Sequence, residues 1–95
     1  MCGENYFRYY VGEKRELGGR VAPEIAGETV VITSARYEIK KRYTDEIITK
    51  GNCEFEGDEF SAMLSFDEPG DYVFTVYLKV GAEEPVEKAD ICVLG

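Results

Sequence analysis

A proline–glycine turn that opens directly onto an alternating segment constrains the fold of this chain more than any other feature. The turn is Pro69-Gly70, and the alternate positions after it are apolar or aromatic: Tyr72, Phe74, Val76, Leu78 and Val80. A period of two places these side chains on one face of an extended strand, whereas a helix repeats every 3.6 residues. The sequence therefore predicts a half-buried β-strand over residues 72–80.

The same alternation recurs in three other segments, 29–39, 59–66 and 86–94. In the first of them the apolar residues change phase near Ser34, which predicts a β-bulge or a register switch. Gly51-Asn52 and Gly57-Asp58 are dipeptides suited to two-residue hairpin turns. The first is expected to join short strands at 46–50 and 53–56. No segment of ten or more residues has apolar residues at helical spacing. The pattern predicts an all-β, antiparallel sandwich of about seven strands without substantial helix.

The length of 95 residues predicts one domain, with an N-terminal arm over 1–12 and the sandwich over 13–95. The arm carries four aromatic residues, Tyr6, Phe7, Tyr9 and Tyr10. It is predicted to be an edge strand or an extended arm. Gly18-Gly19 is expected to separate two strands of a pair.

The composition excludes several functions. The chain contains no histidine, the usual general base and the commonest metal ligand. Its net charge is −8, which disfavours binding to nucleic acid or to an anionic membrane surface. Residues 1–50 hold nine Lys and Arg against eight Asp and Glu, and residues 51–95 hold two against eleven. In a sandwich the two halves interleave in space, so a role of this charge in solubility is favoured over an acidic binding face.

We expect no signal peptide and no transmembrane segment, because the sequence has neither a cationic start before an apolar run nor an apolar stretch of about 18 residues. A cytoplasmic or virion-associated location is predicted. The three cysteines, Cys2, Cys53 and Cys92, lack metal-ligand spacing and are expected to be free thiols.

Acidic turns suggest a calcium site as a hypothesis. With strands at 29–40, 59–66, 72–80 and 86–94, the turns at 41–45, 57–58 and 81–85 are expected to gather at one end of the sandwich. They carry hard oxygen ligands of the kind that Ca²⁺ requires, on Asp45, Asp58, Glu59, Glu83 and Glu84. The same end is expected to carry Lys40, Lys41 and Arg42. Pairing of these cations with the acids is the favoured interpretation, so neither a specific calcium site nor any cofactor is predicted.

The segment Glu68-Pro69-Gly70-Asp71-Tyr72-Val73-Phe74 resembles the turn and penultimate strand of immunoglobulin-like domains. The resemblance implies that Tyr72, two residues after Gly70, donates its hydroxyl to the backbone at a corner. It also places Phe74 where antibody domains have a disulfide cysteine, and the tryptophan of those domains is absent. The chain is therefore closer to bacterial and phage immunoglobulin-like modules. Over residues 28–94 the order of strands and turns is similar to that of small stand-alone immunoglobulin-like proteins of phages and prophages, which implies a structural or interaction role.

The aromatic arm is the predicted partner-binding region. A single strand cannot turn Tyr6, Phe7, Tyr9 and Tyr10 to one core, so at least two should be exposed or pack against a partner. The other interpretation is that the arm folds back and closes a sheet edge. We expect a non-enzymatic interaction or assembly module that binds a protein partner or a second copy. The alternatives are a carbohydrate-binding or surface-adhesion module, which needs exposed tyrosines aligned across one sheet, and a protein without any link to a virion.

Overall fold

The structure is a computed structural model that describes residues 5–23, 25, 27–44 and 46–95. Every regular element in these ranges is a β-strand. The eight strands, in chain order, are β1 Phe7–Tyr10, β2 Lys14–Arg20, β3 Ile32–Lys41, β4 Ile47–Asn52, β5 Glu54–Glu56, β6 Glu59–Ser65, β7 Gly70–Val80 and β8 Val86–Leu94. The expected all-β class is confirmed, and the structure has eight strands where about seven were predicted.

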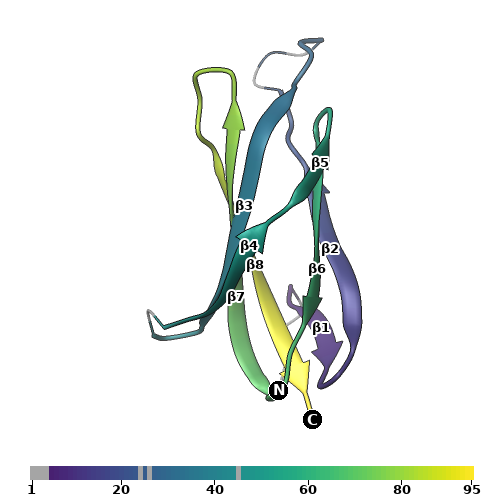
Figure 1. The fold of residues 1–95 in the computed structure, drawn as a ribbon, viewed down its shortest axis with the longest axis vertical. Coiled ribbons are helices and arrows are strands. Elements are labelled where there is room, and N and C mark those ends of the chain that lie inside the picture. Colours follow the sequence, from purple (N-terminus) through teal and green to yellow (C-terminus); the bar gives the residue numbers. More distant parts are fainter. Residues whose placement is uncertain (1–4, 24, 26, 45) are drawn as a thin grey trace.

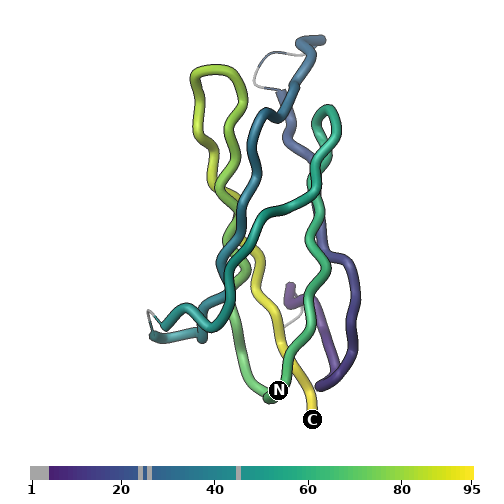
Figure 2. Tube along the Cα trace, viewed as in Figure 1, coloured from purple at the N-terminus to yellow at the C-terminus, as the bar shows by residue number. Residues whose placement is uncertain are grey.

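The strands form two sheets that face each other (Figure 1). The larger sheet has the order β1-β8-β7-β3-β4, and the smaller has the order β2-β6-β5. All pairings are antiparallel except that of β1 with β8, which is parallel. The molecule is elongated, with extents of 43 × 25 × 23 Å, and the C-terminus lies at one end of the long axis (Figure 2).

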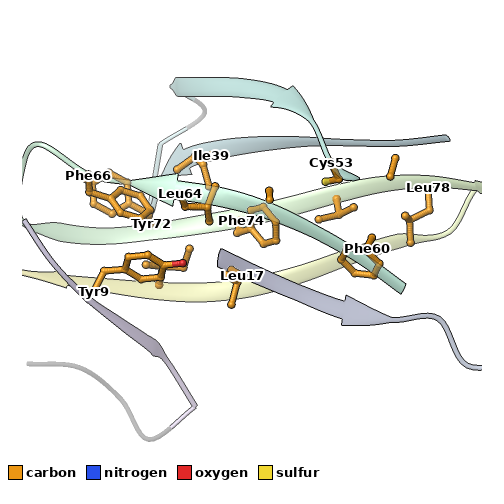
Figure 3. Packing of buried hydrophobic residues seen from close by; sticks show 14 of the residues in the cluster. Tyr9, Leu17, Ile39, Cys53, Phe60, Leu64, Phe66, Tyr72, Phe74 and Leu78 are labelled. Atoms are coloured by element: carbon orange, nitrogen blue, oxygen red, sulfur yellow. The ribbon is translucent and has the colours of Figure 1, made fainter. Parts of the chain in front are cut away.

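The alternating residues form the core between the two sheets (Figure 3). The β7 side chains Tyr72, Phe74, Val76 and Leu78 are buried, at 1–3% exposure. From the smaller sheet, Phe60 and Leu64 on β6 face them. The period-two pattern of the sequence thus correctly identified the buried face of both strands.

The predicted bulge in the 29–39 segment is confirmed. The register of β3 against β7 shifts between Ile32 and Ser34. Ile32 and Ala35 are both buried although they lie three residues apart, which an unbroken alternation does not allow. One extra residue therefore reconciles the two apolar phases seen in the sequence.

Two predicted glycine turns are wrong. Gly18-Gly19 lies inside the continuous strand β2, and Gly51-Asn52 lies at the end of β4, which pairs with β3. After Asn52 the chain crosses to the other sheet at Cys53, whose N–H donates to the Ala35 carbonyl at 3.0 Å. The 53–56 segment therefore pairs with β6 and not with β4. The Gly57-Asp58 turn between β5 and β6 is confirmed, with Gly57 at φ +60°.

Candidate interaction surface

The four aromatic residues of the arm have different environments. Strand β1 lies along the C-terminal half of β8, so the arm closes part of a sheet edge. Tyr9 is fully buried, whereas Phe7 and Tyr10 are 46% and 55% exposed. Tyr6 is half-buried. Phe7 and Tyr10 are thus exposed, in line with the expectation that at least two of the four would be. Tyr9 belongs to the core.

Tyr9 attaches the arm to the sandwich. Its ring meets Phe66 edge to face with centroids 5.2 Å apart, and its hydroxyl donates to the Arg15 carbonyl at 3.1 Å. Burial raises the pKa of this phenol above the ordinary 10.0. On the other side of Phe66 lies Tyr72, with ring centroids 4.9 Å apart. This aromatic row joins β1 to β7 through the residue that follows β6.

The corner at the start of β7 has the geometry that the resemblance implied. The Tyr72 hydroxyl donates to the Glu68 carbonyl at 2.9 Å, and burial raises the pKa of this phenol. Gly70 has φ +145°, a conformation that L-residues rarely adopt. Phe74 is buried and lies 5.7 Å from Tyr37, centroid to centroid.

A cationic and aromatic cluster surrounds Arg42 in the turn after β3. The guanidinium lies 5.3 Å from the ring centroids of both Tyr6 and Tyr43 and forms an ion pair with Asp90. Tyr43 is 88% exposed and has φ +69°. A shallow hollow of about 420 Å³ lies beside the cluster, with Val73 in its lining.

Guanidinium groups lie against three tyrosine rings, those of Tyr77, Tyr6 and Tyr43. Arg36 lies 4.1 Å from the centroid of Tyr77, and Arg42 lies beside Tyr6 and Tyr43. A carbohydrate-binding platform needs free, aligned ring faces. These contacts do not favour the carbohydrate alternative.

Unpaired strand edges are the most extended candidate surface. Strands β2, β4, β1 and β5 end the orders of the two sheets. Strand β2 is regular over seven residues, Lys14–Arg20, whereas β4 has a register shift where Ile47 pairs with Lys40. Strands β1 and β5 have four and three residues. Bulges, short length and charged side chains are means by which proteins blunt an edge. Among the described edge strands β2 is the long one without a bulge, and its charged residues are Lys14, Arg15, Glu16 and Arg20.

A cleft opens into the core beside β2. Strand β1 begins at Phe7, opposite Ile91, so no described strand pairs with residues 86–90 of β8 on that side. The cleft there has a volume of about 190 Å³. Its lining includes Phe7, Leu17, Gly18, Gly19, Phe60, Phe74 and Lys88.

The outer surface of the smaller sheet is acidic. A shallow groove of about 880 Å³ crosses it, with Gly18 and Ser61 paired in its floor. The charged residues in its lining are Glu16, Arg20, Glu54, Glu56 and Glu59. Arg20 pairs with Glu59 and lies 3.5 Å from the Asp58 carboxylate.

A second groove lies between β4 and β6 on the opposite side of the sandwich. Strand β5 pairs with β6 only at Glu59–Ser61, so the rest of β6 is uncovered there. The groove has a volume of about 580 Å³, and its lining includes Ile48, Phe66, Asp67 and Glu68. Ile47 and Ile48 are 44% and 40% exposed on β4.

The expected gathering of three acidic turns at one end is wrong. Lys41 pairs with Tyr72 at one end of β7, whereas Ile32 pairs with Val80 at the other. The turn after Lys41 thus lies at the opposite end from the turns at 57–58 and 81–85. Asp45 lies outside the described residues. In the described ranges no group of three or more His, Cys, Asp or Glu side chains is placed to hold a metal ion.

The cysteines differ from one another. Cys53 is a buried free thiol, and burial raises its pKa to about 11. Cys92 is 4% exposed and disulfide-bonded, so the expectation of free thiols throughout is wrong at this position. Cys2 lies outside the described residues.

Sequence reasoning missed the edge of β2, because Gly18-Gly19 resembled a break. The signal that identifies a strand there is the polar and charged residues at Glu16 and Arg20 on either side of buried Leu17. In the described part of the chain no helix is long and apolar enough to cross a membrane. No protein-family model, curated protein or solved structure matches the chain.

Proposed function

We propose that this chain is a non-enzymatic interaction and assembly module of immunoglobulin-like type, and that it serves as a structural protein of a phage or prophage particle. The observation that carries the proposal is the set of unpaired edges on both sheets, with the long edge of β2 first among them. An open edge offers a row of backbone donors and acceptors to another chain, and pairing along it is a recurrent mode of protein association.

Exposed apolar side chains support an interaction role. Ile47 and Ile48 on β4 and Phe55 on β5 are each 40–44% exposed. Strand edges with neighbouring apolar side chains can exchange water for contacts with a partner. The non-enzymatic part of the proposal rests on the absence of histidine from the sequence and on the raised pKa of the buried Cys53 thiol, which disfavours a nucleophilic thiolate.

The immunoglobulin-like type is supported by the strand order and by the Tyr72 corner. Five strands with the order β1-β8-β7-β3-β4 face three with the order β2-β6-β5, and β1 runs parallel to the last strand. The hydrogen bond from Tyr72 to Glu68 is a feature found at the corner of such sandwiches. The virion role rests on the resemblance of residues 28–94 to small phage proteins.

Two measurements test the proposal. Genes for capsid, tail or portal proteins beside this gene are expected, and so is a constant ratio of this chain to the major capsid protein in gradient-purified particles by mass spectrometry. Metabolic neighbours and absence from the particles would contradict the virion role.

The interaction role is tested by adding purified chain to particles made without it and measuring co-sedimentation. The double variant Ile47→Lys, Ile48→Lys is expected to bind less, because it places charge on the apolar part of β4. Val86→Lys is the matched control, because it places charge on an apolar side chain that is 48% exposed at the start of β8, away from β4. Particles that bind neither the natural chain nor the control would contradict an interaction role in the virion.

A further inference from the structure

We propose that two copies of this chain associate through their β2 strands, antiparallel about a two-fold axis at Gly18, to give one continuous six-stranded sheet. The inference rests on the proposed assembly function and names the partner as a second copy. The sheet order across the pair is β5-β6-β2 followed by β2-β6-β5 of the other copy.

The backbone groups of β2 point alternately toward β6 and toward the open edge. The N–H of Val21 donates to the Asp58 carbonyl at 2.8 Å, which makes this a hydrogen-bonded pair with the β6 side. Antiparallel ladders alternate, so Gly19 and Leu17 also direct their backbone groups to β6. Glu16, Gly18 and Arg20 therefore direct their N–H and C=O groups to the open edge.

The register of β2 against β2 of the second copy is limited by the symmetry of the pair. In a two-fold antiparallel pair one residue lies opposite its own copy. Centring on Gly18 places Glu16 of each copy opposite Arg20 of the other. Opposite charges thus meet twice, as two ion pairs. All three residues with outward backbone groups then lie in hydrogen-bonded pairs.

The neighbouring registers are worse. Centring on Glu16 or on Arg20 places like charges face to face, and centring on Leu17 places Lys14 against Arg20 twice. Like charges directly opposite each other destabilise a strand pair. Centring on Gly19 leaves Glu16 and Arg20 without each other. Charge complementarity therefore selects the Gly18 register.

In the described part of the chain, the open edge of β2 is covered along one half only. Strand β1 lies beside one half of β2: Tyr9 bonds to Arg15, and Phe7 lines the cleft together with Gly18. Beyond Gly18 the cleft extends along residues 86–90 of β8, with which no described strand pairs on that side. A two-fold axis at Gly18 turns the covered half of one copy toward the other half of its partner, so that two covered halves do not meet.

The test is charge reversal, read by sedimentation equilibrium over a range of concentrations. The natural chain is expected to dimerise. Arg20→Glu places two carboxylate pairs in the interface and Glu16→Arg two guanidinium pairs, so each is expected to weaken the dimer about tenfold or more. The double variant Glu16→Arg, Arg20→Glu restores both pairs in reverse and is expected to regain the dimer.

Lys50→Glu on β4 is the matched control, because it changes the net charge as Arg20→Glu does but lies on another edge. It is expected to leave the dimer unchanged. Circular dichroism melts report whether each variant folds. Glu16→Gln and Arg20→Gln serve in place of a reversal that does not fold, and each is expected to weaken the dimer without like-charge repulsion.

Three results would overturn the inference: a natural chain that stays monomeric at its highest soluble concentration, single variants that dimerise as it does, or a double variant that stays monomeric. A monomeric chain that still co-sediments with particles would leave the proposed function standing and remove only the second copy as partner. A charge-dependent dimer that is absent from particles would leave the second copy standing as the partner and remove the virion role.

Discussion

Tyr9 and Tyr72 enter the same end of the core from different strands, and each keeps one hydrogen bond there. Their rings lie on either side of Phe66, and their hydroxyls donate to the backbone carbonyls of Arg15 and Glu68. A buried hydroxyl without a partner costs free energy, so these bonds allow two phenols in an apolar core. Removing a hydroxyl therefore tests the bond without disturbing the ring packing.

Tyr72→Phe is expected to lower the free energy of unfolding by about 1 kcal/mol, because it removes the bond to Glu68 and keeps the ring. Urea unfolding measures the change. Tyr10→Phe is the control, since its side chain is 55% exposed, and it should change stability by less than about 0.5 kcal/mol. Equal effects of the two substitutions would mean that the corner bond contributes nothing.

Cys53 is expected to resist thiol reagents in the folded protein. A pKa of about 11 instead of the ordinary value near 9 leaves roughly 100-fold less thiolate near neutral pH. Labelling with iodoacetamide at pH 8, followed by mass spectrometry of the Cys53 peptide, should be slow without urea and fast in it. Rapid labelling of the folded chain would show that the thiol is not buried.

The raised pKa of Cys53 also has a consequence for stability. The thiol is the form that the folded state prefers, so its contribution is complete below the unfolded pKa, near 9, and is lost as the pH rises through about 11. Cys53→Ala is expected to flatten the fall in unfolding free energy between pH 9 and pH 11. An unchanged fall would assign it to other groups.

At the scale of the elements, the contact between β2 and β6 depends on small residues. A Cβ on Gly18 would overlap the Phe60 carbonyl oxygen and lie 2.8 Å from Ser61 Cβ, so the two strands would have to separate. A Cβ on Gly19 would lie 3.1 Å from the tip of the Phe60 ring, which can turn aside. The glycines therefore permit close pairing of the strands.

Gly18→Ala is expected to destabilise the chain by about 1–3 kcal/mol, and Gly19→Ala by less. Thermal unfolding of both variants at one pH gives the order. Equal losses of stability, or a larger loss for Gly19→Ala, would mean that β2 does not approach β6 as closely as the structure has it.

Local signals predicted the elements that local chemistry determines. Pro69-Gly70 followed by alternating residues identified β7, and Gly57-Asp58 identified the turn between β5 and β6. Each of these patterns is complete within a few residues. Gly51-Asn52 has the same turn chemistry, yet Gly51 lies in β4 against the Tyr37 ring, where a Cβ would approach to 3.2 Å. That contact comes from a residue distant in the chain, so a local pattern cannot reveal it. The strand β2 was missed for a related reason, because Gly18 and Gly19 lie close to Phe60, and no local pattern reveals that contact.

At the scale of the molecule, an acidic groove and a basic strand lie in different sheets. The groove on the smaller sheet holds Glu16, Glu54, Glu56 and Glu59 against Arg20. Basic β3, with Arg36, Lys40 and Lys41, lies between β7 and β4 in the other sheet. The halves interleave, as expected, and four acidic residues from both halves lie together on the surface of the smaller sheet. In the proposed dimer each Glu16 of that surface meets the partner's Arg20.

The net charge of −8 makes the salt dependence of the dimer informative. Two such copies about 25 Å apart, the shorter width of the molecule, repel by about 5 kcal/mol at 0.01 M salt and about 0.5 kcal/mol at 0.15 M. Salt also weakens the two exposed Glu16–Arg20 pairs, but each contributes only about 0.2–1 kcal/mol. Relief of the repulsion is larger, so the dissociation constant is expected to fall at least tenfold over this range.

Sedimentation equilibrium at the two salt concentrations measures this change. The double charge-swap variant has the same net charge and should follow the same trend, whereas Arg20→Glu, with two more negative charges, should need more salt to associate. Weaker association in 0.15 M salt would contradict this balance, because it would mean that the ion pairs and not the edge hydrogen bonds dominate the contact between the copies.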